Sequence, residues 1–225
     1  MRTVLVVGVV AVAAALLLSA SYELSKDRIA ANERARLVRT LASVLDPALR
    51  DRDLDTVRLT VRDRELLGSD DGTDVFVAFE GGRPVAAVFA SSAPDGYNAP
   101  IRLLIGLSAD GTVTGVRVVS HRETPGLGDA IEIDKSPWIT QFDGKRLTEP
   151  ELWALDKEGG PFDSITGATI TSRAVVEAVH GTLLYFAAHR DELFAAARDA
   201  PPAMPEDVEP DERRTEPNPA PGGAP

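Results

Sequence analysis

The stretch IRLLIGLSADGTVTGVRVVS, residues 101–120, decides the fold class of this chain. Its two halves, 101–108 and 112–120, are rich in apolar and β-branched residues, which favour β-strands. Between them stands Asp110-Gly111, a pair that favours tight turns because glycine accepts the backbone angles that such turns need. The stretch therefore predicts an antiparallel β-hairpin.

A second hairpin and a long helix complete the predicted architecture. Residues 75–80 and 84–90 are strand-like runs joined across Gly81-Gly82. Much later in the chain, a helix-forming run extends from about residue 172 to residue 198. Strands followed by one long helix predict an α+β domain, in which helices pack on an antiparallel sheet.

The composition limits the classes of function. The chain has 225 residues, a formal net charge of −11 and 44% apolar residues, which fits one domain with appendages. The acidic balance argues against a nucleic-acid partner, because no stretch offers the basic face that a phosphate backbone needs. Cysteine is absent, which excludes disulfides and thiolate iron–sulfur clusters, and three histidines disfavour a histidine-rich metal centre. We predict no metal site, and a redox role would need an organic cofactor.

The N-terminal residues predict a membrane anchor. No charged residue occurs from Val4 to Ala20, and this run is just long enough to cross a bilayer as a helix. A cleaved signal peptide is the alternative, because a short positive segment precedes the run and small residues follow it. We expect an uncleaved anchor over residues 1–22, in contact with membrane lipid. An amphipathic juxtamembrane helix is expected over 23–48, where Asp46-Pro47 ends the apolar stripe.

The C-terminal residues differ in composition from the rest. From residue 201 onward the chain is dense in proline and acidic residues and has almost no apolar side chains. Such a segment cannot offset the entropy of ordering. We predict a disordered acidic, proline-rich tail over 199–225, which leaves residues 49–198 as the folded domain.

The segment DSITGATITS, residues 163–172, has the form D-x-x-T-G-A-T and stands directly before the predicted long helix. A helix start favours phosphate, because unpaired backbone N–H groups and the helix dipole point at it. Two small residues precede Thr169 and leave its hydroxyl uncrowded. The alternative is ordinary helix capping, for which four residues of the segment are suited: Thr166, Thr169, Thr171 and Ser172.

A second loop, HRETPGLGD at residues 121–129, carries two glycines and a proline after a predicted strand. Such a loop is rigid and lets backbone approach a flat ligand closely. An exposed turn with an Arg122–Glu123 ion pair is the alternative. Four aromatic side chains either stack on a ligand ring or belong to the core: Trp138, Phe142, Trp153 and Phe162.

Taken in order, these segments resemble one family. After the apolar N-terminal run come Gly96-Tyr97, 101–106, the 121–129 loop, 135–138 and GGPFD at 159–163, which runs into the T-G-A-T motif. This order resembles the G subunit of the Rnf-type (Rsx) ion-translocating electron transport complexes of bacterial inner membranes. In that family the last threonine of the motif carries FMN through a phosphoester bond. The resemblance spans about residues 1–193 and is densest from 96 to 179.

The resemblance implies FMN covalently attached to Thr169 by a separate flavin transferase, which uses FAD and a divalent metal. It implies a membrane-anchored flavoprotein that relays electrons within a complex coupling electron transfer to ion translocation. Such a chain is an electron-transfer subunit rather than an enzyme on its own. Its partners are the other subunits of the complex and the transferase, and its folded domain lies on the periplasmic side of the inner membrane.

The motif and the loop supply the candidate cofactor contacts. Besides Thr169 these are Thr166, Gly167, Ala168 and Thr171 in the motif, and His121, Glu123, Thr124 and Leu127 in the loop. Two alternatives stay open. One is the C subunit of a Na⁺-pumping NADH:quinone oxidoreductase, which shares the motif, and the other is a membrane-anchored scaffold without flavin.

Overall fold

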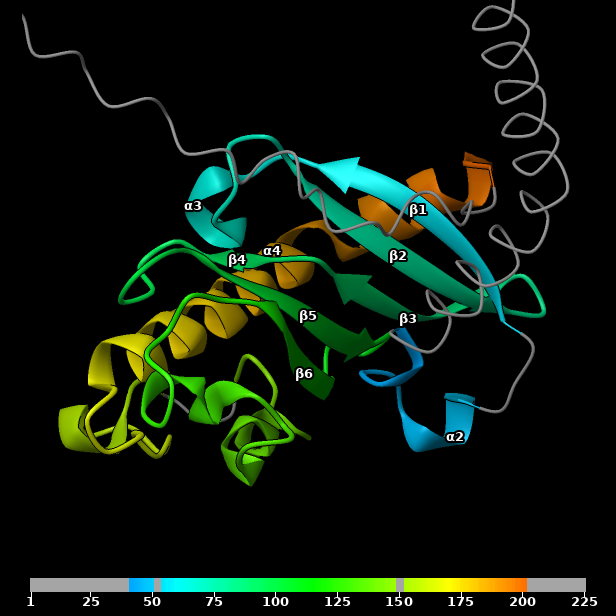
Figure 1. Cartoon of the computed structure of the whole chain (residues 1–225). Helices are drawn as coiled ribbons and strands as arrows, with labels where there is room; N and C mark the ends of the chain where they lie inside the picture. Colours follow the sequence, from blue (N-terminus) through cyan, green and yellow to red (C-terminus); the bar gives the residue numbers. More distant parts are fainter. Residues whose placement is uncertain (1–40, 51–53, 149–151, 202–225) are drawn as a thin grey trace, which may run out of the picture. The chain divides into compact units, whose positions relative to one another are not determined.

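The computed structural model describes residues 41–50, 54–148 and 152–201. In this part of the chain an antiparallel sheet packs against one long helix, which confirms the α+β prediction (Figure 1). The predicted anchor over 1–22, most of the predicted 23–48 helix and nearly all of the predicted tail over 199–225 lie outside the described residues. Among the helices that are described, none has both the length and the apolarity needed to span a bilayer.

The elements follow one another along the chain in a simple order. They are α2 (Pro47–Arg50), β1 (Asp55–Val61), α3 (Arg64–Leu67), β2 (Thr73–Glu80), β3 (Arg83–Phe89), β4 (Ser92–Ala93), β5 (Ile101–Ser108), β6 (Val113–Ser120) and α4 (Thr169–Asp199). Three short 3-10 helices lie between β6 and α4: η1 (Gly128–Ile131), η2 (Pro137–Phe142) and η3 (Asp156–Glu158).

Both predicted hairpins are present. β2 pairs with β3 across Gly81-Gly82, whose φ angles of 56° and 76° suit the primed turns that match the twist of the strands. β5 pairs with β6, and Asp110 in their turn accepts hydrogen bonds from the Ser108 hydroxyl (2.5 Å) and the Thr112 N–H (3.2 Å). The Ser108 bond holds the pKa of Asp110 below its ordinary value. The sheet runs β1-β2-β3-β5-β6, and β4 pairs with β5 beyond the end of β3.

One face of the sheet is covered by α4, which passes behind the strands in Figure 1. Alternate strand residues such as Val77 and Ile105 form a single core with Val179 and Leu183 of the helix. α3 crosses α4 at Gly181, where an added Cβ would lie 2.3 Å from the carbonyl oxygen of Leu66. The helix begins at Thr169, three residues before the start predicted from the sequence.

Residues 41–50 lie against the opposite face of the sheet. Gly106 lies between two core-facing residues of β5, so its own side faces away from α4. A Cβ on Gly106 would lie 2.1 Å from the carbonyl oxygen of Val44, and one on Gly115 would lie 3.0 Å from the Val44 Cα. The Thr114 hydroxyl donates to the same Val44 oxygen at 2.5 Å. The two strand glycines therefore let the incoming chain lie directly on the sheet.

His180 makes the stability of this fold depend on pH. Its imidazole stacks on the Trp153 indole, with ring centroids 5.4 Å apart, and burial lowers the pKa of His180 below its ordinary value of 6.5. Unfolding restores the ordinary pKa, so the unfolded chain binds more protons between the folded pKa and 6.5. The free energy of unfolding should therefore fall as pH decreases through this window. In urea unfolding at about pH 7.5 and about pH 5.5, the wild-type chain should lose more stability than His180→Gln, and equal losses would contradict this.

Candidate functional site

The motif forms a turn that leads directly into α4. The N–H of Ala168 donates to the carbonyl of Ile165 at 3.0 Å, and Gly167 between them has a φ of 82°. Glycine adopts this positive φ without strain. Ala168 occupies the N-cap position without a side-chain cap bond, which makes Thr169 the first helical residue. Thr169 therefore lies where the first N–H groups of the helix have no partners within it.

Four of the five hydroxyls in residues 163–172, those suited to helix capping, differ in their surroundings. The Thr171 hydroxyl is buried and donates to Glu123, and the Ser172 hydroxyl is buried and donates to the Ala168 carbonyl at 3.0 Å. The Ser172 oxygen also accepts from the Ile165 N–H at 3.0 Å. Thr169 is half-buried and Thr166 is exposed, and within the described part of the chain neither side chain forms a hydrogen bond. Of these four hydroxyls, two are at least partly exposed and form no hydrogen bond with the described residues, and of those two only that of Thr169 is at the helix start.

The 121–129 loop lies beside this turn. The carbonyl of Thr124 accepts the N–H groups of Leu127 (3.1 Å) and Gly128 (3.0 Å), which folds the loop back on itself. Leu127 reaches the motif, since its Cδ2 would lie 3.1 Å from a Cβ placed on Gly167. The side chain of Thr124 is exposed on the same loop. The structure therefore brings Leu127 and the motif together.

Glu123 and His121 point into the protein instead. Glu123 is only 4% exposed, so the alternative of an exposed Arg122–Glu123 ion pair is wrong. His121 Nδ1 accepts the Glu123 N–H at 3.0 Å, and its Nε2 is 2.9 Å from a carboxylate oxygen of Glu132. With Nδ1 as the acceptor, Nε2 carries the proton that is donated to Glu132. His121 thus braces the base of the loop, and no contact with the motif is described for it.

Three large apolar side chains are exposed around the turn. Ile170 follows Thr169 and is 47% exposed, Leu127 against Gly167 is 46% exposed, and Tyr97 is 63% exposed. Tyr97 belongs here because its neighbours Gly96 and Asn98 approach Glu123, whose other carboxylate oxygen binds Thr171. Exposed large apolar side chains on neighbouring segments are typical of a surface that binds a ligand or a partner. Such surroundings suit an apolar or aromatic ligand.

Arg173 is a functional candidate that the sequence analysis missed. It lies four residues after Thr169, so both side chains are on one face of α4, and helical side chains lean toward the N-terminus. Arg173 binds Glu158, which lowers the pKa of that carboxyl, and both groups are on the surface. The signal in the sequence was the spacing of four residues between a candidate phosphate acceptor and a guanidinium.

The aromatic side chains mostly form core rather than a ligand site. Phe142, Phe162 and Trp153 are buried and lie against one another, with centroids 5.1 Å and 4.9 Å apart for the successive pairs. Trp138 is half-buried and packs on Phe142, and its Nε1–H donates to the carbonyl of Asp163 at 2.7 Å. This row of four aromatic side chains therefore packs against the start of the motif and holds it through the Trp138–Asp163 hydrogen bond.

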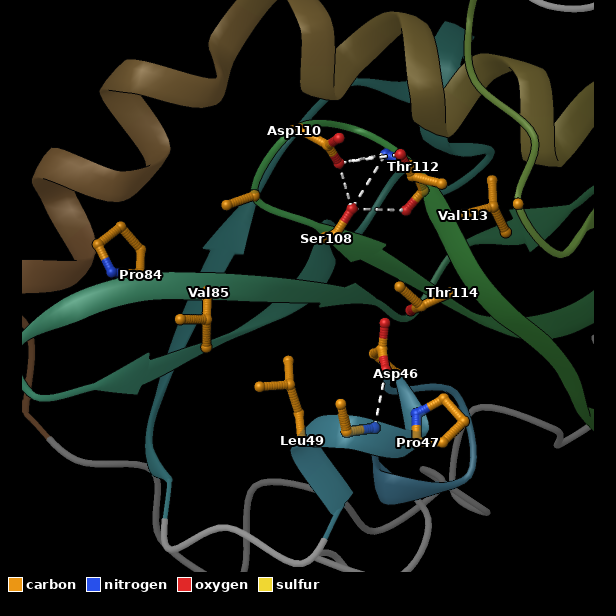
Figure 2. A pocket seen from close by; sticks show the side chains of 13 residues that line it. Asp46, Pro47, Leu49, Pro84, Val85, Ser108, Asp110, Thr112, Val113 and Thr114 are labelled. Carbon is orange, nitrogen blue, oxygen red and sulfur yellow. Dashed lines mark hydrogen bonds between the residues drawn. The ribbon is translucent and has the colours of Figure 1, made fainter.

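A separate groove of about 700 Å³ lies between α2 and the β5–β6 hairpin (Figure 2). It is lined by both apolar and polar side chains, among them Leu49, Val85 and Thr114. None of the candidate residues of the motif or of the 121–129 loop lines it. The groove and the candidate site residues are thus in different parts of the domain. We therefore assign the site from the surroundings of the motif hydroxyls and not from the volume of the groove.

Comparisons with known proteins identify the family that this chain resembles. The FMN-binding domain family matches residues 96–183, which contain the Gly96–Asn98 segment, the loop and the motif. The G subunit of the ion-translocating oxidoreductase complex of Pseudomonas aeruginosa (strain UCBPP-PA14) is 43% identical over 197 residues, 87% of this chain and 92% of that protein. The protein of the same name from Aliivibrio fischeri (strain MJ11) is 39% identical over 85% of this chain and 92% of its own length. The protein of that name from Shewanella oneidensis (strain MR-1) is 40% identical over 75% of this chain and 81% of its own length.

Proposed function

Since the chain belongs to the G-subunit family of ion-translocating oxidoreductase complexes, we propose that it carries FMN in phosphoester linkage to Thr169. In this proposal it relays electrons between other subunits of such a complex. One observation carries the proposal. Of the five hydroxyls in residues 163–172, only that of Thr169 combines a position at the start of α4 with a partly exposed side chain that forms no hydrogen bond within the part of the chain that the structure describes.

The residues around Thr169 suit a phosphate diester. The first N–H groups of α4 and the positive end of its dipole favour the charge that the phosphate retains. Arg173, one turn further along, supplies a cation that can exchange Glu158 for the phosphate. Gly167 and Ala168 leave room for the ribityl chain, because neither carries a side chain larger than a methyl group.

In the attachment reaction, Thr169 presents the oxygen that receives the FMN phosphate. The Thr169 Oγ1 forms a bond to the phosphorus of the FMN half of FAD, the pyrophosphate bond breaks, AMP leaves and the hydroxyl proton is released. A separate flavin transferase with a divalent metal provides catalysis for this transfer. When attached, FMN supplies transfer of one or two electrons, which no side chain of this chain can perform. The exposed side chains of Tyr97, Leu127 and Ile170 would be available to cover its ring.

The membrane placement of the proposal rests on the sequence and the family. The apolar run from Val4 to Ala20 supports an uncleaved anchor over 1–22 and a juxtamembrane helix over 23–48. The domain over 49–198 then works on the periplasmic side of the inner membrane, where a dissociated cofactor would be lost, and the tail over 199–225 follows it. One span forms no path for Na⁺ or H⁺, so the chain moves electrons and other subunits move the ion.

The test is the intact mass of the chain purified from its native membrane and denatured, with peptide mapping of 165–173. We expect an added mass equal to FMN minus water, localised to Thr169. A host shown to flavinylate other proteins serves as the positive control. An unmodified Thr169 from that host would refute the attachment and favour a scaffold role.

A further inference from the structure

Glu123 is an unusual residue for a loop. Among the described residues it is the one buried residue that carries a formal charge, at 4% exposure. Burying a carboxylate is costly unless it is hydrogen-bonded. One of its oxygens accepts from the Thr171 hydroxyl and the other accepts from the N–H of Asn98 at 3.3 Å. The carboxylate therefore links the loop to two other segments of the chain.

The surrounding backbone is shaped to admit this carboxylate. A Cβ on Gly128 would lie 2.8 Å from the Cβ of Glu123 and 3.1 Å from its Oε2. A Cβ on Gly96 would lie 3.2 Å from its Oε1 and only 2.2 Å from the carbonyl oxygen of Ala99. Asn98 adds a second link to the loop, because its Nδ2 donates to the Arg122 carbonyl at 2.9 Å. Gly96 and Gly128 thus leave the space that the Glu123 carboxylate occupies, because a side chain on either glycine would collide with it.

The partner of Glu123 lies in the attachment turn, residues 165–171, which contains Thr169. Thr171 is in the first turn of α4, two residues after Thr169, and its buried hydroxyl is held by Glu123. The same loop touches the turn at a second point, where Leu127 lies against Gly167. Two contacts on either side of Thr169 fix the orientation of the helix start relative to the loop. Loss of the Glu123 contact would remove the polar one of these two.

We propose that Glu123, acting through Thr171, is a positioning residue for flavin attachment: it holds Thr169 in the orientation that the flavin transferase accepts. The inference rests on the proposed function and deepens it. Glu123 is then not a contact of the flavin ring but a buried acceptor that holds the attachment turn in place. Acceptor atoms must be held closely for transfer, and a displacement of about 1 Å can cost about 100-fold in rate.

The test measures transfer of flavin from FAD to the full-length chain by purified flavin transferase with Mg²⁺, followed by flavin fluorescence in denaturing gels. We expect Glu123→Ala and Thr171→Val each to lower kcat about tenfold, with a smaller change in KM for the chain. Thr171→Ser keeps the donating hydroxyl and should stay within about twofold of wild type. The double variant Glu123→Ala/Thr171→Val should be no slower than either single variant, since both remove one contact.

Glu177→Ala is the matched control, because it removes an exposed carboxylate from the same helix. Circular dichroism below the unfolding temperature establishes that each variant is folded. A folded Glu123→Ala chain that is modified at the wild-type rate overturns the inference. A Thr171→Val chain that is modified as fast as Thr171→Ser also overturns the inference. This second comparison remains decisive if Glu123→Ala fails to fold. A wild-type chain that takes up no flavin overturns the proposed function as well, whereas a modified wild type with unaffected variants overturns the positioning role alone.

Discussion

Thr169→Ala is expected to abolish covalently attached flavin while leaving the domain folded. The substitution removes the one open hydroxyl at the start of α4, and its buried neighbours Thr171 and Ser172 are engaged in hydrogen bonds and cannot replace it. Alanine is favourable in a helix, so the free energy of unfolding should stay within about 1 kcal/mol of wild type. The measurement is flavin fluorescence of the chain in a denaturing gel, together with its intact mass.

Thr148→Ala provides the control for this experiment. Thr148 is exposed and lies outside the motif, so its variant should carry the same amount of flavin as the wild-type chain. Flavin retained on Thr169→Ala would contradict the assignment. Peptide mapping would then show whether the exposed Thr166 had been modified in its place.

Phe162→Ala is expected to have the largest effect on stability. The ring is fully buried between Phe142 and Trp153, and its removal leaves a cavity that the packed aromatic rings cannot fill. Removal of a buried phenylalanine side chain costs about 3–5 kcal/mol. Phe162 also adjoins Asp163, the first residue of the motif, so the attachment turn should lose its support. Urea unfolding followed by tryptophan fluorescence gives the change in free energy.

Leu152→Ala is the control for the aromatic cluster. Leu152 precedes Trp153 but is 51% exposed, so its truncation should change the free energy of unfolding by no more than about 0.5 kcal/mol. If Phe162→Ala cost as little as Leu152→Ala, the aromatic row would not be part of the core.

Local signals in the sequence were enough to predict the hairpins but not every element. Gly81-Gly82 and Asp110-Gly111 require or favour turn geometry, so the pairing of their flanking strands followed. β1 was missed although Val57, Leu59 and Val61 alternate with polar residues, because no tight turn joins it to β2: α3 lies between the two strands. In the folded chain β1 pairs with β2, and a guanidinium nitrogen of Arg58 lies 2.8 Å from a carboxylate oxygen of Asp74 on the neighbouring strand.

The start of α4 was placed too late for a related reason. The helix-forming run predicted a start at about residue 172, and four residues from Thr166 to Ser172 were equally suited to cap it. In the folded chain its hydroxyl donates back to the Ala168 carbonyl at 3.0 Å, a bond made from inside the helix. The actual N-cap, Ala168, forms no side-chain cap bond and so leaves no signal in the sequence.

The candidate site was predicted in its parts but not in its assembly. Small residues before Thr169 and glycines in the 121–129 loop were visible as local patterns. The bond between Glu123 and Thr171 joins residues 48 positions apart, and only tertiary packing brings them together. The same holds for the aromatic residues, since stacking on a ligand and burial in the core demand the same residue types.

The unequal surroundings of the four hydroxyls suited to helix capping imply an order of events in maturation. On an unfolded chain, Thr166, Thr169, Thr171 and Ser172 are equally accessible and chemically alike. They become distinguishable only after α4 has packed and two of them have been buried. An enzyme that selects among them by accessibility therefore acts on the folded domain, so a chain that folds slowly also acquires its cofactor slowly.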